Sequence, residues 1–197
     1  MKIIKLSFIL LLPYLSGISQ ANFPLPTNES GQIAFSNVVN VENTSKEILF
    51  LNTLNYLQAV VNDQRNLKAH PIFNEDSTEI TLPLTYTVYH DFPIHSPHGL
   101  IKYQFTVAVK DSRYRYVATG FTFHYLKRNR YGKFVEVKGK SKPLEEPVFK
   151  GKQKLWDQYK EELPEKTDQF VQELQAQIMI LPQVPEEKIV KVNDDDW

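Results

Sequence analysis

The most informative stretch of this sequence is Tyr103-Gln104-Phe105-Thr106-Val107-Ala108-Val109-Lys110-Asp111-Ser112-Arg113-Tyr114-Arg115-Tyr116. Apolar and polar side chains alternate through its first half, which is the period of a strand with one buried face. The polar triplet at 110–112 interrupts the pattern, and alternation resumes after it. We therefore predict a β-hairpin, with one strand over 99–109 and its partner over 113–127.

The partner strand is expected to place two sets of side chains on opposite faces of the sheet. One face would carry Val117, Thr119, Phe121, Phe123 and Tyr125, and the other Tyr114, Tyr116, Ala118 and Gly120. Gly120 is a candidate for a bulge or for the close approach of another backbone, because glycine has no side chain to pack.

Alternation predicts further strands on both sides of this hairpin. The clearest covers 79–90, and an earlier one over 31–41 is weakened by Asn37 on its apolar side. Residues 69–73 suit a short strand, and 134–137 suit either an edge strand or a loop.

Two regions show the period of a helix. The first, 45–61, begins at Thr44-Ser45-Lys46-Glu47, where Thr44 and Glu47 have the spacing of a capping box. The second comprises 152–163 and 165–180, and Pro164 either separates two helices or begins the second of them.

The order of elements is strand, helix, four or five antiparallel strands and a C-terminal helix. Such elements bury their apolar faces as an antiparallel sheet covered by helices on one side. We therefore predict an α+β fold in a single domain over 31–181. A lead-in over 22–30 would precede it, and a mobile charged tail over 182–197 would follow it.

The first 21 residues have the three parts of a cleavable secretory signal peptide. Lys2 and Lys5 form a basic start, an apolar run follows over 6–15, and Ser19 and Ala21 occupy the positions that signal peptidase reads. The run is shorter than the ~20 residues that cross a bilayer. We therefore expect export to the periplasm, the cell envelope or the medium, with no membrane-spanning segment in the mature protein.

Charge and composition narrow the classes of partner. The 197 residues hold 23 basic and 23 acidic side chains, and a leader with two lysines and no acid leaves a mature net charge of −2. Such a protein has no overall field that attracts nucleic acid, so we expect no nucleic-acid partner. The absence of cysteine excludes disulfides, thiolate metal sites, a cysteine nucleophile and a lipid anchor on an N-terminal cysteine.

Most of the mature chain, from Gly31 to about Gln177, resembles a Bacteroidota family of domains of unknown function with a TATA-binding-protein-like (TBP-like) fold, DUF4468. The resemblance is carried by the early strand at 33–39, the helix start at 45–50 and the hairpin at 103–116. A glycine is usual in the family's hairpin turn, where this sequence has Ser112. The resemblance implies an exported protein with a curved antiparallel sheet backed by helices, in a TBP-like or helix-grip-like arrangement. It implies no established activity and brings no functional residues.

One segment, 90–98, is rich in histidine. Its weak candidates for metal ligands are His90, Asp91, His95 and His98. Imidazole and carboxylate groups suit zinc or copper, but Pro93 and Pro97 restrict how such close residues converge. We favour a polar loop between two strands and expect no cofactor. Ser96 beside these histidines lacks the elbow that presents a nucleophile, so no catalytic residue is assigned.

Basic and aromatic residues interleave over 113–116 and over 124–131. Such runs can stack nucleobases or sugars. Regular alternation equally fits a strand whose tyrosines pack and whose arginines face water, and we favour that interpretation. If a ligand binds the sheet, we expect it on the face of Tyr114 and Tyr116, with Lys102 and Gln104 on the neighbouring strand.

Two functional hypotheses follow. The first is a non-catalytic periplasmic or envelope module that binds an unknown protein or small ligand, through the open sheet face or the groove between sheet and C-terminal helix. The alternative is a metal-dependent or hydrolytic enzyme that uses the segment 90–98. Asp76-Ser77-Thr78 also resembles a short O-glycosylation site of Bacteroidota secretory proteins, which makes Ser77 a candidate acceptor.

Overall fold

The computed structural model describes residues 25–63, 71–73, 78–90, 95–148 and 152–179. These ranges form six strands and two helices. In chain order they are β1 (Ala34–Asn40), α1 (Lys46–Asp63), β2 (Ile72–Phe73), β3 (Glu79–His90), β4 (Ser96–Lys110), β5 (Arg113–Arg128), β6 (Phe134–Pro143) and α2 (Gln153–Ile178). The predicted α+β order is confirmed, and the region around 134–137 is a strand.

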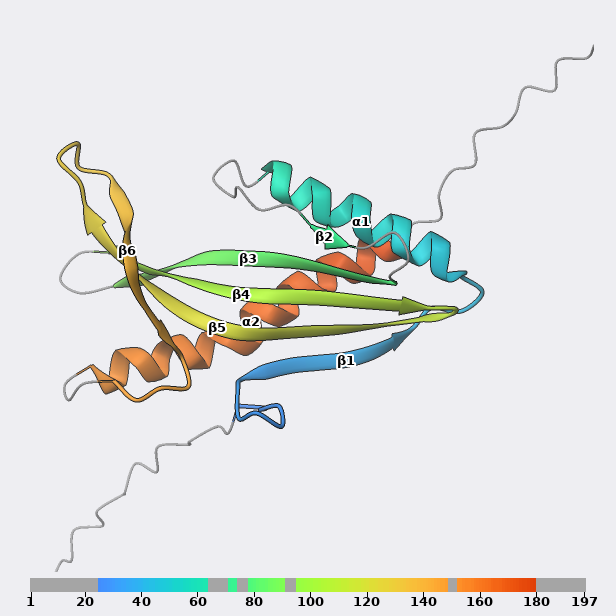
Figure 1. Ribbon diagram of the computed structural model, residues 1–197, viewed down its shortest axis with the longest axis horizontal. Coiled ribbons are helices and arrows are strands. Elements are labelled where there is room, and N and C mark those ends of the chain that lie inside the picture. The colour runs from blue at the N-terminus through green and yellow to red at the C-terminus, as the bar shows by residue number, and fades with distance from the viewer. Residues whose placement is uncertain (1–24, 64–70, 74–77, 91–94, 149–151, 180–197) are drawn as a thin grey trace, which may run out of the picture.

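The strands form one antiparallel sheet in the order β1-β5-β4-β3-β2. β5 is long enough to pair with β1 along its first half and with β6 along its second half. β3, β4, β5 and β6 follow one another in the chain and are neighbours in the sheet. Figure 1 shows β6 rising away from the other strands at one end of the molecule.

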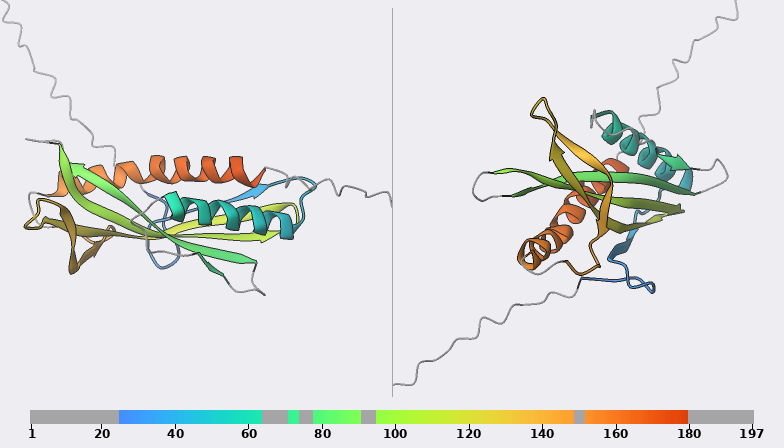
Figure 2. Two further views of the ribbon diagram at one scale, coloured as in Figure 1. Left: turned by 90° about the horizontal axis from the view of Figure 1, so that it is seen from above. Right: turned by 60° about the vertical axis from the view of Figure 1, so that its left-hand side comes forward.

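Both helices lie on the same side of the sheet (Figure 2). The core forms between them and the sheet, because β3 and β4 bury alternate residues on that side. The largest fully buried side chains are Tyr114, Tyr159, Phe105, Phe121, Phe123, Leu49, Leu57, Ile80, Leu82, Ile101, Leu144 and Leu163. Within the described ranges, neither helix has both the length and the apolar character needed to cross a membrane.

The bulge suggested at Gly120 is present, and it overturns the predicted assignment of the β5 side chains to the two faces. Gly120 has a φ of 72°, and the pairing with β4 slips so that Lys102 faces Thr122 while Gln104 faces Thr119. The extra residue changes which side chains point to the helices. The buried residues of β5 are therefore Tyr114, Tyr116 and Ala118 before the bulge and Phe121 and Phe123 after it.

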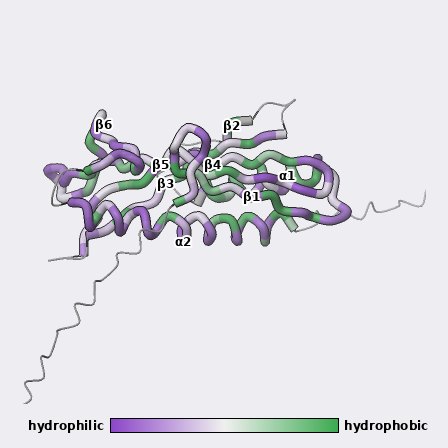
Figure 3. The backbone as a smooth tube through the Cα atoms, turned by 90° about the horizontal axis from the view of Figure 1, so that it is seen from below, coloured by the Kyte–Doolittle hydropathy of each residue, from purple (hydrophilic) through white to green (hydrophobic). Residues whose placement is uncertain are grey.

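The C-terminal helix is continuous, so the prediction of two helices divided at Pro164 is wrong. Pro164 cannot donate a backbone hydrogen bond to the preceding turn. The helix nevertheless runs through it, because residues on both sides form one buried stripe: Trp156, Tyr159, Leu163, Thr167, Val171, Leu174 and Ile178. Figure 3 shows hydrophobic and hydrophilic segments alternating along α2, as expected for a helix with one face on a core.

The start of α1 also differs from the predicted capping box. The Ser45 hydroxyl, and not that of Thr44, accepts a hydrogen bond from the Ile48 amide at 3.4 Å. Asp111, in the β4–β5 turn, accepts one from the Lys46 amide at 3.0 Å. The helix start is thus tied to the hairpin turn, a long-range contact that local spacing cannot reveal.

Candidate functional site

A groove of about 300 Å³ lies between the middle of β3 and the middle of α2. Its lining residues are Leu84, Thr85, Tyr86, Thr87, Tyr103, Lys166, Gln169, Phe170 and Glu173. Four of these are consecutive residues of β3. Because successive side chains of a strand point to opposite faces, a cavity that touches four in a row must lie along the edge of that strand.

The edge of β3 is unpaired over most of its described length. β2 pairs only with Ile80 and Thr81, and among the described residues no strand lies beside β3 from Leu82 onward. Pro83 indicates which backbone groups point to this edge. A proline within a strand sits where its missing N–H would point away from the neighbouring strand. By alternation, the backbone N–H and C=O groups of Thr85 and Thr87 also point outward, into the groove.

The wall contributed by α2 combines an aromatic ring with charged groups. The Phe170 ring packs against Tyr56 of α1 and Phe105 of β4, with centroids 5.8 and 4.7 Å apart. Lys166 and Glu173 lie two helical turns apart along the groove, about 10 Å. The Tyr56 hydroxyl donates to Glu173 Oε2 at 3.2 Å. Burial, followed by the charge of Glu173, raises the pKa of Tyr56, so this hydroxyl stays protonated.

Tyr86 gives the groove a buried polar atom. Its hydroxyl oxygen makes no hydrogen bond among the described residues. Burial raises the pKa of Tyr86 well above its usual value, and Tyr103 and Glu162 act in the same direction. A buried hydroxyl without a partner costs about 1–3 kcal/mol. A buried polar group without a partner is one sign of a functional site.

The four predicted ligand residues do not share a face. Tyr114 and Tyr116 are 1% and 8% exposed and lie under the helices, where Tyr116 stacks on Phe105. Lys102 and Gln104 lie on the opposite, polar face, because Tyr103 between them points to the core. The expectation of a common surface was wrong, since adjacent strands of a sheet are in register and the buried residues of β4 and β5 pair with each other.

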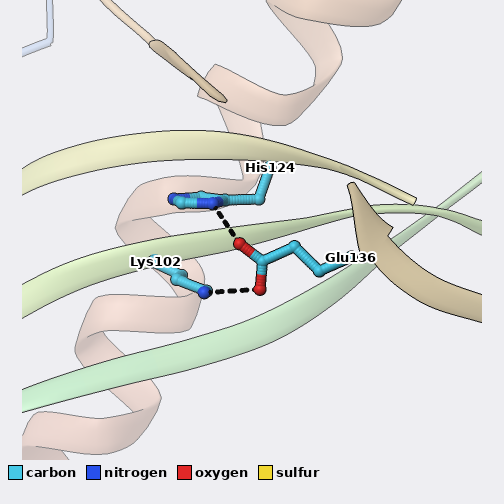
Figure 4. A network of polar contacts seen from close by, with 3 residues as sticks. All are labelled: Lys102, His124 and Glu136. Carbon is cyan, nitrogen blue, oxygen red and sulfur yellow. Dashed lines mark hydrogen bonds and ion pairs between the residues drawn. The ribbon is translucent and has the colours of Figure 1, made fainter. Parts of the chain in front are cut away.

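Lys102 is already engaged on the polar face. Its Nζ atom lies 2.7 Å from Glu136 Oε2, and His124 Nδ1 lies 2.6 Å from Glu136 Oε1 (Figure 4). Lys102, Glu136 and His124 come from β4, β6 and β5, so this cluster joins the three strands. The hydrogen bond from Lys102, opposed by slight burial and aided by His124, lowers the pKa of Glu136.

The three histidines of the segment 90–98 do not form one cluster. His95 stacks on Tyr89, with centroids 4.6 Å apart. His98 turns toward the core, where its Nδ1 atom lies 2.5 Å from the Tyr159 hydroxyl, and its ring lies 5.7 Å from that of His90. Asp91 lies outside the described residues. Among the residues that are described, no three histidine, aspartate or glutamate side chains gather as a metal site would require.

His98 should make stability depend on pH. Burial, followed by the charges of His90 and Lys152, lowers the pKa of His98 below 6.5. The unfolded chain therefore binds more protons in this range, and the folded state loses stability as pH falls below about 6.5. We expect His98→Gln to lose less stability than the wild type between pH 8 and pH 5 in urea titrations. Equal losses in the two proteins would contradict this assignment.

The histidine prediction compares the wild type and the variant in matched buffers, because other polar and charged groups lie near His98. His90 of β3 is present in both proteins, as are Lys152 and Tyr159 from the α2 side. The difference between the two pH slopes therefore reports His98 together with its interaction with His90.

Comparisons with known proteins bear on the fold that carries these groups. Residues 35–124 match the family model described as a domain of unknown function (DUF4468) with TBP-like fold. This is the family that the sequence resembles. A crystal structure of a DUF4468 family protein from Bacteroides ovatus has a TM-score of 0.58 at 12% identity, covering 82% of this chain and 94% of that one. The α+β, TBP-like fold is therefore confirmed.

A second solved structure is a TBP-like protein from Parabacteroides distasonis, with a TM-score of 0.48 at 20% identity. It covers 64% of this chain and 73% of that chain. No curated protein matches the sequence significantly. The DUF4468 match thus defines an architecture, and a function has to be argued from the residues described above.

The sequence predicts a groove between the sheet and the C-terminal helix, but it does not indicate which residues line that groove. Thr85 and Thr87 look like the solvent face of an ordinary strand, and Lys166 and Glu173 like a solvated helix surface. One signal was present, because Pro83 inside a strand pattern marks an edge. Ser77, the leader and the tail over 182–197 lie outside the described residues.

Proposed function

We propose that this DUF4468 chain is an exported, non-catalytic binding module whose ligand is an extended peptide segment. The observation that carries the proposal is the groove touched by four consecutive residues of β3 and walled by α2. An unpaired strand edge beside a helix can accept one further strand, held by backbone hydrogen bonds and by side-chain contacts with the helix.

The outward backbone groups of Thr85 and Thr87 would form the hydrogen bonds with the peptide. Such bonds are independent of peptide sequence, so specificity has to come from side chains. The Phe170 ring offers an apolar contact, and Lys166 and Glu173 offer opposite charges about 10 Å apart. That spacing equals about three residues of extended chain. We therefore expect preferred peptides to carry an acidic residue about three residues from a basic one.

The first 21 residues of the sequence support the exported part of the proposal. The basic start, the apolar run and the residues Ser19 and Ala21 have the order of a cleavable leader. Cleavage after Ala21 would begin the mature chain at Asn22. A module without an assigned catalytic group would then act outside the cytoplasm by holding a segment of another polypeptide.

The test begins with the full-length chain produced in a bacterium. The cell is first fractionated and the N-terminus of the chain is sequenced, and a chain found only in the cytoplasm with Met1 retained would refute the export part. A phage-displayed library of linear 12-residue peptides is then selected on the protein, and one enriched peptide is synthesised for titration. We expect Thr85→Pro to weaken its binding at least about tenfold, because it removes an outward N–H while leaving the pairing with β4 intact.

Matched variants distinguish backbone from side-chain recognition. Thr85→Val keeps the N–H, so peptide binding should be unchanged. Lys166→Glu should weaken the binding of peptides that were selected for their acidic residue. Circular dichroism checks that each variant is folded. The peptide proposal fails if no peptide is enriched, or if Thr85→Pro binds as well as Thr85→Val. A dimer of this chain that Thr85→Pro dissociates would instead show that the edge pairs with a second copy.

A further inference from the structure

The β5–β6 hairpin concentrates positive charge on one projecting element. Seven of the residues from Lys127 to Lys142 are basic: Lys127, Arg128, Arg130, Lys133, Lys138, Lys140 and Lys142. All except Lys142 are exposed, and Lys142 pairs with Glu146 at 3.7 Å. The only acid in that range is Glu136, whose two oxygens contact Lys102 and His124. Those partners lie on β4 and β5 before the hairpin's basic run, so Glu136 does not neutralise the six exposed cations of the hairpin.

The near-neutral net charge of the chain therefore conceals a separation of charge. α2 carries six acidic side chains and three lysines, whereas the hairpin has an excess of six positive charges. Electrostatic interactions are screened beyond about 8–10 Å at physiological ionic strength. A surface that approaches the hairpin thus experiences the local positive charge and not the sum over the chain.

The tip of the hairpin is a fixed turn that presents aromatic rings. Asn129 Oδ1 accepts hydrogen bonds from the Tyr131 and Lys133 amides at 2.9 and 3.0 Å. Tyr131 is 70% exposed and Phe134 is 36% exposed. The guanidinium of Arg130 lies 4.8 Å from the Tyr131 ring centre, and that of Arg128 lies 5.3 Å from Phe134.

We propose that the β5–β6 hairpin docks the protein onto an anionic lipid surface. Exposed tyrosine and phenylalanine beside arginine and lysine is the composition that proteins place at a membrane interface, with rings among the headgroups and cations on lipid phosphates. The shape of the hairpin fits this proposal, because the hairpin rises away from the other strands, where a flat surface can contact it (Figure 1). This docking rests on different residues from the peptide groove.

The test measures co-sedimentation with vesicles at physiological salt. We expect the protein to bind phosphatidylethanolamine vesicles that contain a quarter phosphatidylglycerol, and not vesicles of phosphatidylcholine alone. Reversing two charges with Lys138→Glu and Lys140→Glu should weaken binding at least about tenfold, since each basic residue near such a surface contributes severalfold. Tyr131→Ser should weaken binding severalfold while leaving its salt dependence unchanged.

The matched control reverses two lysines at the other end of the sheet. Lys46 and Lys110 lie at the start of α1 and the end of β4, and Lys46→Glu with Lys110→Glu makes the same change in net charge. We expect vesicle binding to stay within about twofold of the wild type. Equal loss in both pairs would overturn the proposal, as would absence of binding to the anionic vesicles. Preferential binding of a soluble polyanion such as polyglutamate, insensitive to Tyr131→Ser, would also overturn it.

Discussion

Phe105→Ala lowers the free energy of unfolding by about 3–5 kcal/mol, the range for deleting a fully buried aromatic ring. Phe105 is completely buried on β4, where its ring stacks on Tyr116 and meets Phe170 of α2 edge to face. The loss combines the burial free energy of the deleted ring with the cost of the cavity that it leaves between sheet and helix. Urea unfolding monitored by circular dichroism measures the change.

A matched control separates the position of Phe105 from its residue type. Phe134→Ala removes the same ring from the β5–β6 hairpin, where the side chain is partly exposed. We expect it to cost about 0.5 kcal/mol or less, as is usual for surface positions. Comparable losses in the two variants would show that Phe105 does not occupy the core. Because Phe170 lines the groove, Phe105→Ala should also weaken peptide binding in conditions where the variant is folded.

Gly99→Ala destabilises the protein by about 1–3 kcal/mol, the range for overpacking a core. A Cβ atom on Gly99 would overlap the ring of Phe123 on the neighbouring strand. That ring cannot move aside, because it is stacked on Tyr159 and packed against Trp156, with centroids 5.6 and 5.5 Å away. The Phe123 ring therefore leaves room only for glycine at position 99.

A double-mutant cycle tests this explanation of the Gly99 effect. Phe123→Leu removes the flat ring that covers Gly99, at a cost of its own in lost packing. We expect Gly99→Ala to cost at least about 1 kcal/mol less in the Phe123→Leu background than in the wild type. Additive costs would show that the alanine is disfavoured for another reason, such as the nearby carbonyl oxygen of His124.

The sequence predicted the class of fold and most of its elements because they depend on local periodicity. The hairpin around 110–112, the strand over 79–90 and the single covered face all follow from alternation. The failures involve residues whose effect depends on partners elsewhere. Gly120 suggested a bulge, but only the pairing with β4 shows that the bulge exchanges the two faces of β5. Pro164 was compatible with a break, and tertiary packing kept α2 continuous.

The candidate site was less predictable for the same reason. For the run over 113–116 the favoured interpretation is confirmed, because Tyr114 and Tyr116 are buried in the core while Arg113 and Arg115 are exposed. The run over 124–131 looked similar in sequence, but it leads into a hairpin whose basic residues are exposed. Which of two similar runs is buried depends on where α2 crosses the sheet, and that path is set by residues far along the chain.

The position of β1 has a consequence for the order in which the chain can fold. β3, β4, β5 and β6 form a meander whose contacts are short in sequence, whereas Ala34 of β1 pairs with Thr119 of β5. Closing that long loop carries an entropic cost that neighbouring hairpins avoid. The meander is therefore expected to assemble first and to serve as the template on which the N-terminal strand is added late.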